Sequence, residues 1–109
     1  MNYRNHAKIK LNHPTLCRGD FYLNCGDGWY QLIDEMLTEI EKVRGQLMPR
    51  LAYIEPNKGR MKAVVDGMNA EIQDIIDAYE YRSQRICEGC GGKGQPRSGW
   101  IMAACNDCR

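Results

Sequence analysis

The sequence has no long apolar run, no strong net charge and no internal repeat or low-complexity segment. No stretch approaches the roughly 18 apolar residues that a membrane-spanning helix needs. The polar first segment, residues 1–14, has no apolar core of the kind found in a secretory signal. Fifteen basic and 14 acidic side chains nearly cancel, which argues against strong nonspecific affinity for nucleic acid or a membrane surface. We therefore expect a cytoplasmic protein without a membrane partner.

The recognisable motifs of catalysis are also missing. The sequence has no nucleophile elbow, no glycine-rich phosphate loop and no zinc motif with an open coordination position. We interpret the acidic pairs Asp34/Glu35 and Asp74/Asp77 as solvated helix positions rather than as an acid–base pair. The sequence thus predicts that the protein is not an enzyme and has no small-molecule substrate.

What the sequence does have is six cysteines, four of which form two pairs near the C-terminus. Cys87–Cys90 and Cys105–Cys108 give the spacing C-x2-C-x14-C-x2-C. Each pair lets two thiolates converge on one ion, and two pairs complete a tetrahedron without an open position. We predict that these four cysteines bind a structural Zn²⁺ in a zinc-ribbon-like module. Iron at the same four thiolates, or disulfides, are the alternatives.

The other two cysteines, Cys17 and Cys25, follow the histidines His6 and His13. Their spacing matches no metal-binding knuckle. Reduced cysteines are commonly buried as small apolar groups. We predict two buried structural thiols and two surface histidines.

The periodicity of apolar residues predicts two helices. The first begins at Asp27, the expected N-cap, and its apolar positions recur every three or four residues as far as Val43. A second stripe runs from Met68 to Ile86. Between them, residues 51–54 and 61–65 read as the strands of a hairpin with a turn over 55–59.

These elements predict a single α+β domain over residues 1–109. It comprises an irregular or partly extended N-terminal arm (1–26), a helix–hairpin–helix unit (27–86) and the zinc module (87–109). The two helices are expected to pack on one another and on the hairpin, because neither can bury its stripe alone.

Charge is divided unevenly along the chain: the helices are acidic, whereas the hairpin and the module carry a surplus of basic side chains. An acidic helical face suits a basic surface on another protein, and the carboxylates expected to form it are Glu39, Glu41, Glu71, Asp74 and Asp77. The alternative is a nucleic-acid interface, with Trp100 as a stacking group, formed by Arg50, Lys58, Arg60, Lys62, Lys93, Arg97 and Trp100.

Two motifs together carry a family resemblance over residues 20–108. The first is the helix start CGDGWYQLI (25–33); the second is Ser83-x3-Cys87-Glu-Gly-Cys90-Gly, followed by Gly-Trp before the last cysteine pair. In these features the chain resembles a family of small bacteriophage and prophage proteins. The resemblance implies a phage origin and a zinc fold.

From this resemblance and the acidic helices we expect a non-catalytic protein that binds a host protein complex in the host cytoplasm and inhibits or redirects it. A nucleic-acid-processing complex or a defence system would be a fitting target. A regulatory nucleic-acid-binding zinc ribbon, or a virion or assembly component, are the alternatives. The sequence leaves the oligomeric state open.

Overall fold

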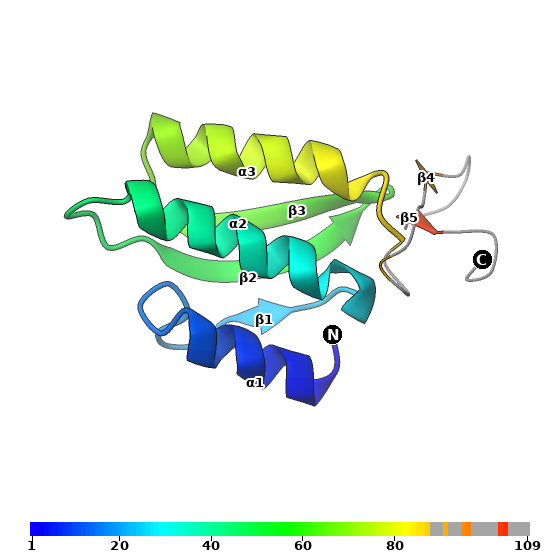
Figure 1. The fold of residues 1–109 in the computed structure, drawn as a ribbon, viewed down its shortest axis with the longest axis horizontal. Helices are drawn as coiled ribbons and strands as arrows, with labels where there is room; N and C mark the ends of the chain where they lie inside the picture. Colours follow the sequence, from blue (N-terminus) through cyan, green and yellow to red (C-terminus); the bar gives the residue numbers. More distant parts are fainter. Residues whose placement is uncertain (88–90, 92–94, 97–102, 105–109) are drawn as a thin grey trace.

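A computed structural model describes residues 1–87, 91, 95–96 and 103–104. It is an α+β fold in which helices cover one face of a three-stranded sheet, with α2 between α1 and α3 (Figure 1). None of the helices in the described part of the chain combines the length and apolarity that a membrane span requires. The elements of this fold are α1 (Tyr3–Asn12), β1 (Tyr22–Leu23), the 3-10 turn η1 (Asp27–Trp29), α2 (Tyr30–Val43), β2 (Arg50–Asn57), β3 (Arg60–Asp66) and α3 (Ala70–Ser83).

The predicted hairpin is confirmed, and its strands are longer than the sequence suggested. β2 and β3 pair antiparallel around a two-residue turn, Lys58–Gly59, whose φ angles are 56° and 81°. Two left-handed residues match the twist of the flanking strands, which is why short hairpins favour such turns. The short strand β1 adds to the other side of β2 in a parallel register. A second, two-stranded ladder pairs β4 (Gln95–Pro96) with β5 (Ala103–Ala104).

Both predicted helices are confirmed, and the buried part of each apolar stripe belongs to the core; Met68, the first residue of the second stripe, precedes α3 and is exposed. The largest buried side chain is Trp29 at the start of α2. The stripe of α2 contributes five buried residues and that of α3 three, which are Leu32, Ile33, Met36, Leu37 and Ile40, and Ile72, Ile76 and Ser83.

The predicted N-cap of the first of these helices is wrong. Asp27 lies in η1, and its carboxylate accepts hydrogen bonds from the Asn2 backbone (2.6 Å) and from the Asn5 side chain (3.3 Å). It therefore fastens the N-terminal segment to η1 instead of capping α2.

The prediction of an irregular or partly extended arm over residues 1–26 is wrong for residues 3–12, which form α1, whereas residues 22–23 are extended in β1. The side chain of Asn2 caps this helix by accepting the N–H of Asn5 at 2.8 Å. Only Ile9 of the helix is buried, so no apolar stripe marks it in the sequence. The available signals were the capping asparagine and Pro14 just beyond the last turn.

Helix α3 covers the outer edge of β3 as well as the sheet face. The N–H of Met61 donates to the Ser83 hydroxyl (2.7 Å), and the N–H of Ala63 donates to the Glu80 carboxylate (2.9 Å). Ser83 is fully buried, and burial raises the pKa of Glu80 despite the hydrogen bond from Ala63, which lowers it. Two backbone donors that an edge strand would otherwise leave open are thereby satisfied.

Candidate functional site

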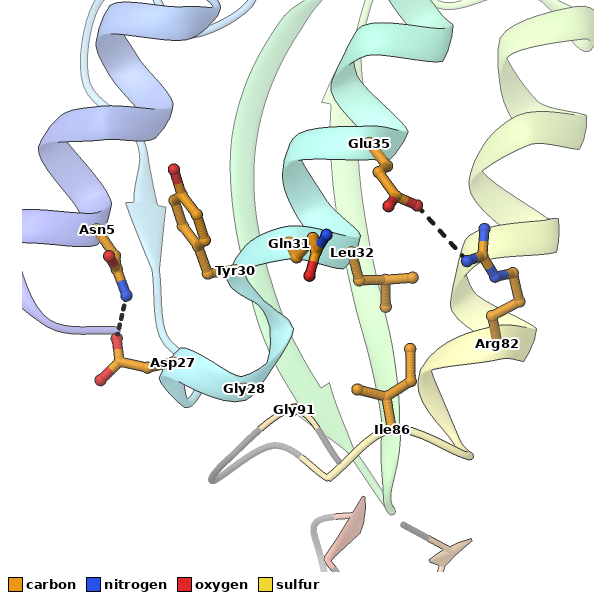
Figure 2. Close-up of a pocket in the computed structure, with 10 residues that line it drawn as sticks. All are labelled: Asn5, Asp27, Gly28, Tyr30, Gln31, Leu32, Glu35, Arg82, Ile86 and Gly91. Carbon is orange, nitrogen blue, oxygen red and sulfur yellow. Dashed lines mark hydrogen bonds and ion pairs between the residues drawn. The ribbon is translucent and has the colours of Figure 1, made fainter. Parts of the chain in front are cut away.

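Two cavities adjoin the seam between α2 and α3, and we call them together the α2–α3 groove. The first, of about 410 Å³, is near η1, where Asn5 of α1 also lines it (Figure 2), and the second, of about 450 Å³, is near the start of α3. Residues four apart share one side of a helix, and such a row on α2 contributes to both cavities: Gln31, Glu35, Glu39 and Val43.

The second cavity combines an apolar floor with an acidic rim. Its apolar lining comes from Val43, Ile75, Ala78 and Tyr79, and its carboxylates are those of Glu39, Glu71 and Asp74. No basic side chain is among its described lining residues. One of the three carboxylates, Glu39, forms an ion pair with Lys42 at 3.1 Å, one turn along α2. The lining of this cavity itself supplies three acidic side chains and no basic one among the described residues.

Arg82 contacts both sides of the seam. Its guanidinium lies 3.5 Å from the Glu35 carboxylate of α2, and its central carbon lies 4.7 Å from the ring centroid of Tyr79. Figure 2 shows it reaching from α3 toward Glu35. Both charged side chains are about half exposed, at 52% and 47%. Arg82 is thus the one basic side chain among the described residues that line the groove.

The other end of the first cavity is also acidic. Asp27 lines it, and hydrogen bonds, above all from the Asn2 backbone N–H, lower the pKa of its carboxyl group. A carboxylate held in this way stays ionised at neutral pH. Asp27, Glu35, Glu39, Glu71 and Asp74 therefore place five carboxylates along the groove, against one guanidinium.

The five carboxylates predicted to form the partner face do not all lie together. Glu39, Glu71 and Asp74 share the second cavity. Glu41 lies on another side of α2, where it contacts His13 at 3.1 Å. Asp77 accepts a hydrogen bond from Gln73 at 2.7 Å and lines neither cavity.

Between α1 and α2 lies a second acidic junction, which we call the His13 seam. His13 is only 3% exposed, with Nε2 2.8 Å from Asp34 and Nδ1 3.1 Å from Glu41. The two carboxylates of α2 thus contact the buried imidazole at one ring nitrogen each. The prediction of a surface histidine is wrong for His13, and Asp34 is not simply a solvated helix position.

The predicted burial of Cys17 and Cys25 is confirmed. Burial, with a smaller contribution from the Glu41 carboxylate, raises the pKa of the Cys17 thiol to about 12. A thiol with such a pKa is neutral at physiological pH and is neither a good nucleophile nor a ready metal ligand. His6, the other histidine of this region, stacks on Phe21 with ring centroids 4.6 Å apart.

Of the four predicted zinc ligands, Cys87 lies in the described part of the chain, whereas Cys90, Cys105 and Cys108 lie outside it. Cys87 is fully buried just beyond α3. Within the described residues, no three side chains of metal-binding type converge on one point. A tetrahedral zinc site takes four thiolate ligands, so Cys87 would supply one of them if the other three cysteines complete the set.

The two motifs of the family resemblance meet in space next to Cys87. Trp29 donates its indole N–H to the Ile86 carbonyl at 3.0 Å, and the Gly91 N–H donates to the Cys87 carbonyl at 2.8 Å. A Cβ on Gly91, whose φ is 80°, would approach the Gly28 carbonyl oxygen to 3.1 Å. Close backbone packing therefore requires glycine here and joins the start of the cysteine segment to η1.

Within the described part of the chain, the basic residues of the alternative nucleic-acid interface are interspersed with acidic ones. Arg50 donates to the Asp20 carbonyl (2.8 Å) and lies 3.9 Å from Asp66. Lys62 pairs in register with Glu55, so basic and acidic side chains alternate. The remaining predicted members are Lys58 in the hairpin turn, Arg60 at the start of β3, and Lys93, Arg97 and Trp100, which lie outside the described residues.

The geometry stands without support from known proteins. No protein-family model matches this sequence, and neither curated proteins nor solved structures give a significant match.

Proposed function

We propose that this chain is a small, non-catalytic binding protein that docks on a basic surface of another protein through the α2–α3 groove. The observation that carries the proposal is the second cavity, in which three carboxylates surround an apolar floor. Apolar contacts supply affinity, and a one-signed rim supplies orientation and a fast encounter with an oppositely charged partner.

The expected partner is a host protein complex, by the resemblance of the two sequence motifs to phage proteins. Complexes that process nucleic acid carry basic surfaces, so they suit an acidic groove. Occupying such a surface would inhibit or redirect the complex without any chemical step. In this proposal the four C-terminal cysteines bind a structural Zn²⁺ that stabilises the end of the chain beyond α3.

The test is affinity capture from bacterial lysate with the metal retained, followed by mass spectrometry of both protein and nucleic acid. We expect a stoichiometric protein partner whose recovery survives nuclease treatment and falls with increasing salt. Recovery of nucleic acid without a stoichiometric protein would contradict the proposal.

The metal part is tested separately with Cys87→Ser and Cys90→Ser. We expect loss of bound zinc and of protease resistance beyond residue 87. A retained metal-to-protein ratio of one would overturn the assignment of the ligands. The matched control is Cys17→Ser, which removes a buried thiol that the proposal leaves out of the metal site.

A further inference from the structure

We propose that the occupant of the α2–α3 groove is a basic, amphipathic α-helix. In the free chain, Arg82 occupies the position that an arginine of this helix takes in the complex. This inference rests on the proposed function and names the chemistry of its partner. It depends on the lining of the groove, its length and the contacts of Arg82.

The lining selects an amphipathic basic segment. A helix with an apolar stripe would place that stripe on Val43, Ile75 and Tyr79, in the manner of helices that bind in hydrophobic grooves. Lysine or arginine residues beside the stripe would face Glu39, Glu71 and Asp74. An acidic segment or a nucleic-acid backbone would meet like charge at the same positions.

The length of the groove suits a helix of about four turns. α2 and α3 each have 14 residues, which corresponds to about 21 Å at 1.5 Å per residue. The two cavities extend from Gly28 and Gly91 at one end to Val43 and Glu71 at the other. A bound helix would therefore lie alongside both α2 and α3.

Arg82 shows what the centre of the groove binds. A carboxylate on one side (Glu35, 3.5 Å) and an aromatic face on the other (Tyr79, 4.7 Å) form a cradle for a guanidinium. Because Arg82 is about half exposed, an incoming arginine can displace it at little cost. Arg82 thus competes with the partner and weakens binding until it is displaced.

The first test uses three 14-residue probe peptides and fluorescence anisotropy with the full chain. One is a helix with leucine on one face and arginine beside it, the second carries glutamate for arginine, and the third has the first composition in a scrambled, non-amphipathic order. We expect the first to bind and the others to bind at least tenfold more weakly. Equal affinity of the first and the scrambled peptide would overturn the proposal, because bulk charge would then explain binding.

The second test reverses charge inside and outside the groove. Glu71→Lys with Asp74→Lys should weaken binding of the basic helix by about tenfold or more. Asp66→Lys with Asp77→Lys makes the same change in net charge at exposed sites that line neither cavity, and should change affinity less than twofold. Equal losses in the two variants would overturn the proposal. Glu71→Gln with Asp74→Asn is the milder pair to use if the reversed chain does not fold.

The third test concerns Arg82 alone. Arg82→Gln should strengthen peptide binding about threefold, because it leaves Glu35 and Tyr79 open to the peptide's arginine. Arg85→Gln is the control, since Arg85 lies over Tyr81 (5.0 Å) and outside the groove. Unchanged or weaker binding by Arg82→Gln would refute the competing role.

Two further outcomes separate this inference from the proposed function. If a captured protein partner binds the Glu71→Lys, Asp74→Lys chain as well as the wild type, the partner uses another face. The inference then fails together with the assignment of the groove, while the binding of a host protein stands. If instead the chain self-associates, and Arg4→Glu with Lys8→Glu on α1 abolishes this, the occupant is a second copy and the inference fails.

Discussion

The carboxylates on the two sides of α2 have different surroundings. Toward α1, Asp34 and Glu41 contact His13, a buried side chain of the same chain. Toward α3, Glu35 and Glu39 line a groove where an apolar floor stays open and Arg82 fills only the centre.

This difference distinguishes a helix junction that belongs to the fold from a surface that can bind a partner. In the His13 seam, the side chain that the two carboxylates contact is buried and belongs to the same chain, so the junction is part of the fold. In the α2–α3 groove, the carboxylates remain about half exposed beside apolar side chains, so their ion pairs contribute little to stability. These charged and apolar groups remain available for contact with a partner.

The largest expected contrast lies between two neighbouring isoleucines of α3. Ile76 is 1% exposed in the core, whereas Ile75 lines the groove. Ile76→Ala should lower the free energy of unfolding by about 3 kcal/mol, and Ile75→Ala by about 1 kcal/mol, because the latter leaves no enclosed cavity. Urea unfolding monitored by circular dichroism measures both. Equal losses would show that the groove floor is part of the core.

Removing the histidine should break the His13 seam. His13→Ala removes the buried side chain that Asp34 and Glu41 contact, and should lower the free energy of unfolding by about 2 kcal/mol. Adding Asp34→Asn and Glu41→Gln should recover part of that loss. His6→Ala, at the more exposed histidine, serves as control. A loss no greater than that of His6→Ala would mean that the seam is not structural.

Glu80 offers a third environment for a carboxylate, half-buried and bound to a backbone N–H. Burial raises its pKa in the folded chain above the ordinary 4.5, so the folded state binds the proton more tightly than the unfolded state. Its contribution to stability therefore decreases as pH rises through the interval just above 4.5. The difference in unfolding free energy between wild type and Glu80→Gln, measured from pH 4 to 7, should fall across that interval. A rising difference would contradict the direction.

The smallest effect should have the opposite sign. Asp74 lies three residues from both Glu71 and Asp77 on α3, and like charges at this spacing repel. Asp74→Asn should raise the free energy of unfolding by about 0.3 kcal/mol while weakening binding of the basic helix. Thermal unfolding and peptide titration of the same variant measure the two effects. Reduced stability with unchanged binding would assign Asp74 to the fold rather than to the groove.

The sequence predicted those elements whose burial leaves a periodic pattern. The apolar stripes of α2 and α3, and the apolar and β-branched residues of the two strands around Lys58–Gly59, predicted these elements for that reason. α1 buries only Ile9, and β1 has two residues, so neither leaves such a pattern.

The candidate site was predictable in residue type but not in arrangement. Glu39 and Glu41 are about 200° apart around a helix, so helical geometry alone excludes a shared face. Which of the two sides is covered depends on the packing of α1, which the sequence did not predict. The role of Arg82 depends on Tyr79, three residues away on α3, and on Glu35 of α2. No local sequence pattern links Glu35 to the other two positions.

The hydrogen bonds from β3 to Ser83 and Glu80 have a consequence for aggregation. Sheets with open edges recruit further strands, and a protein made in large amounts then risks aggregation. Here the donors of Met61 and Ala63 are already taken by α3. An extended peptide could pair with β3 at this edge only after α3 had been displaced. A high concentration of the folded protein should therefore not by itself cause fibrils to form through β3.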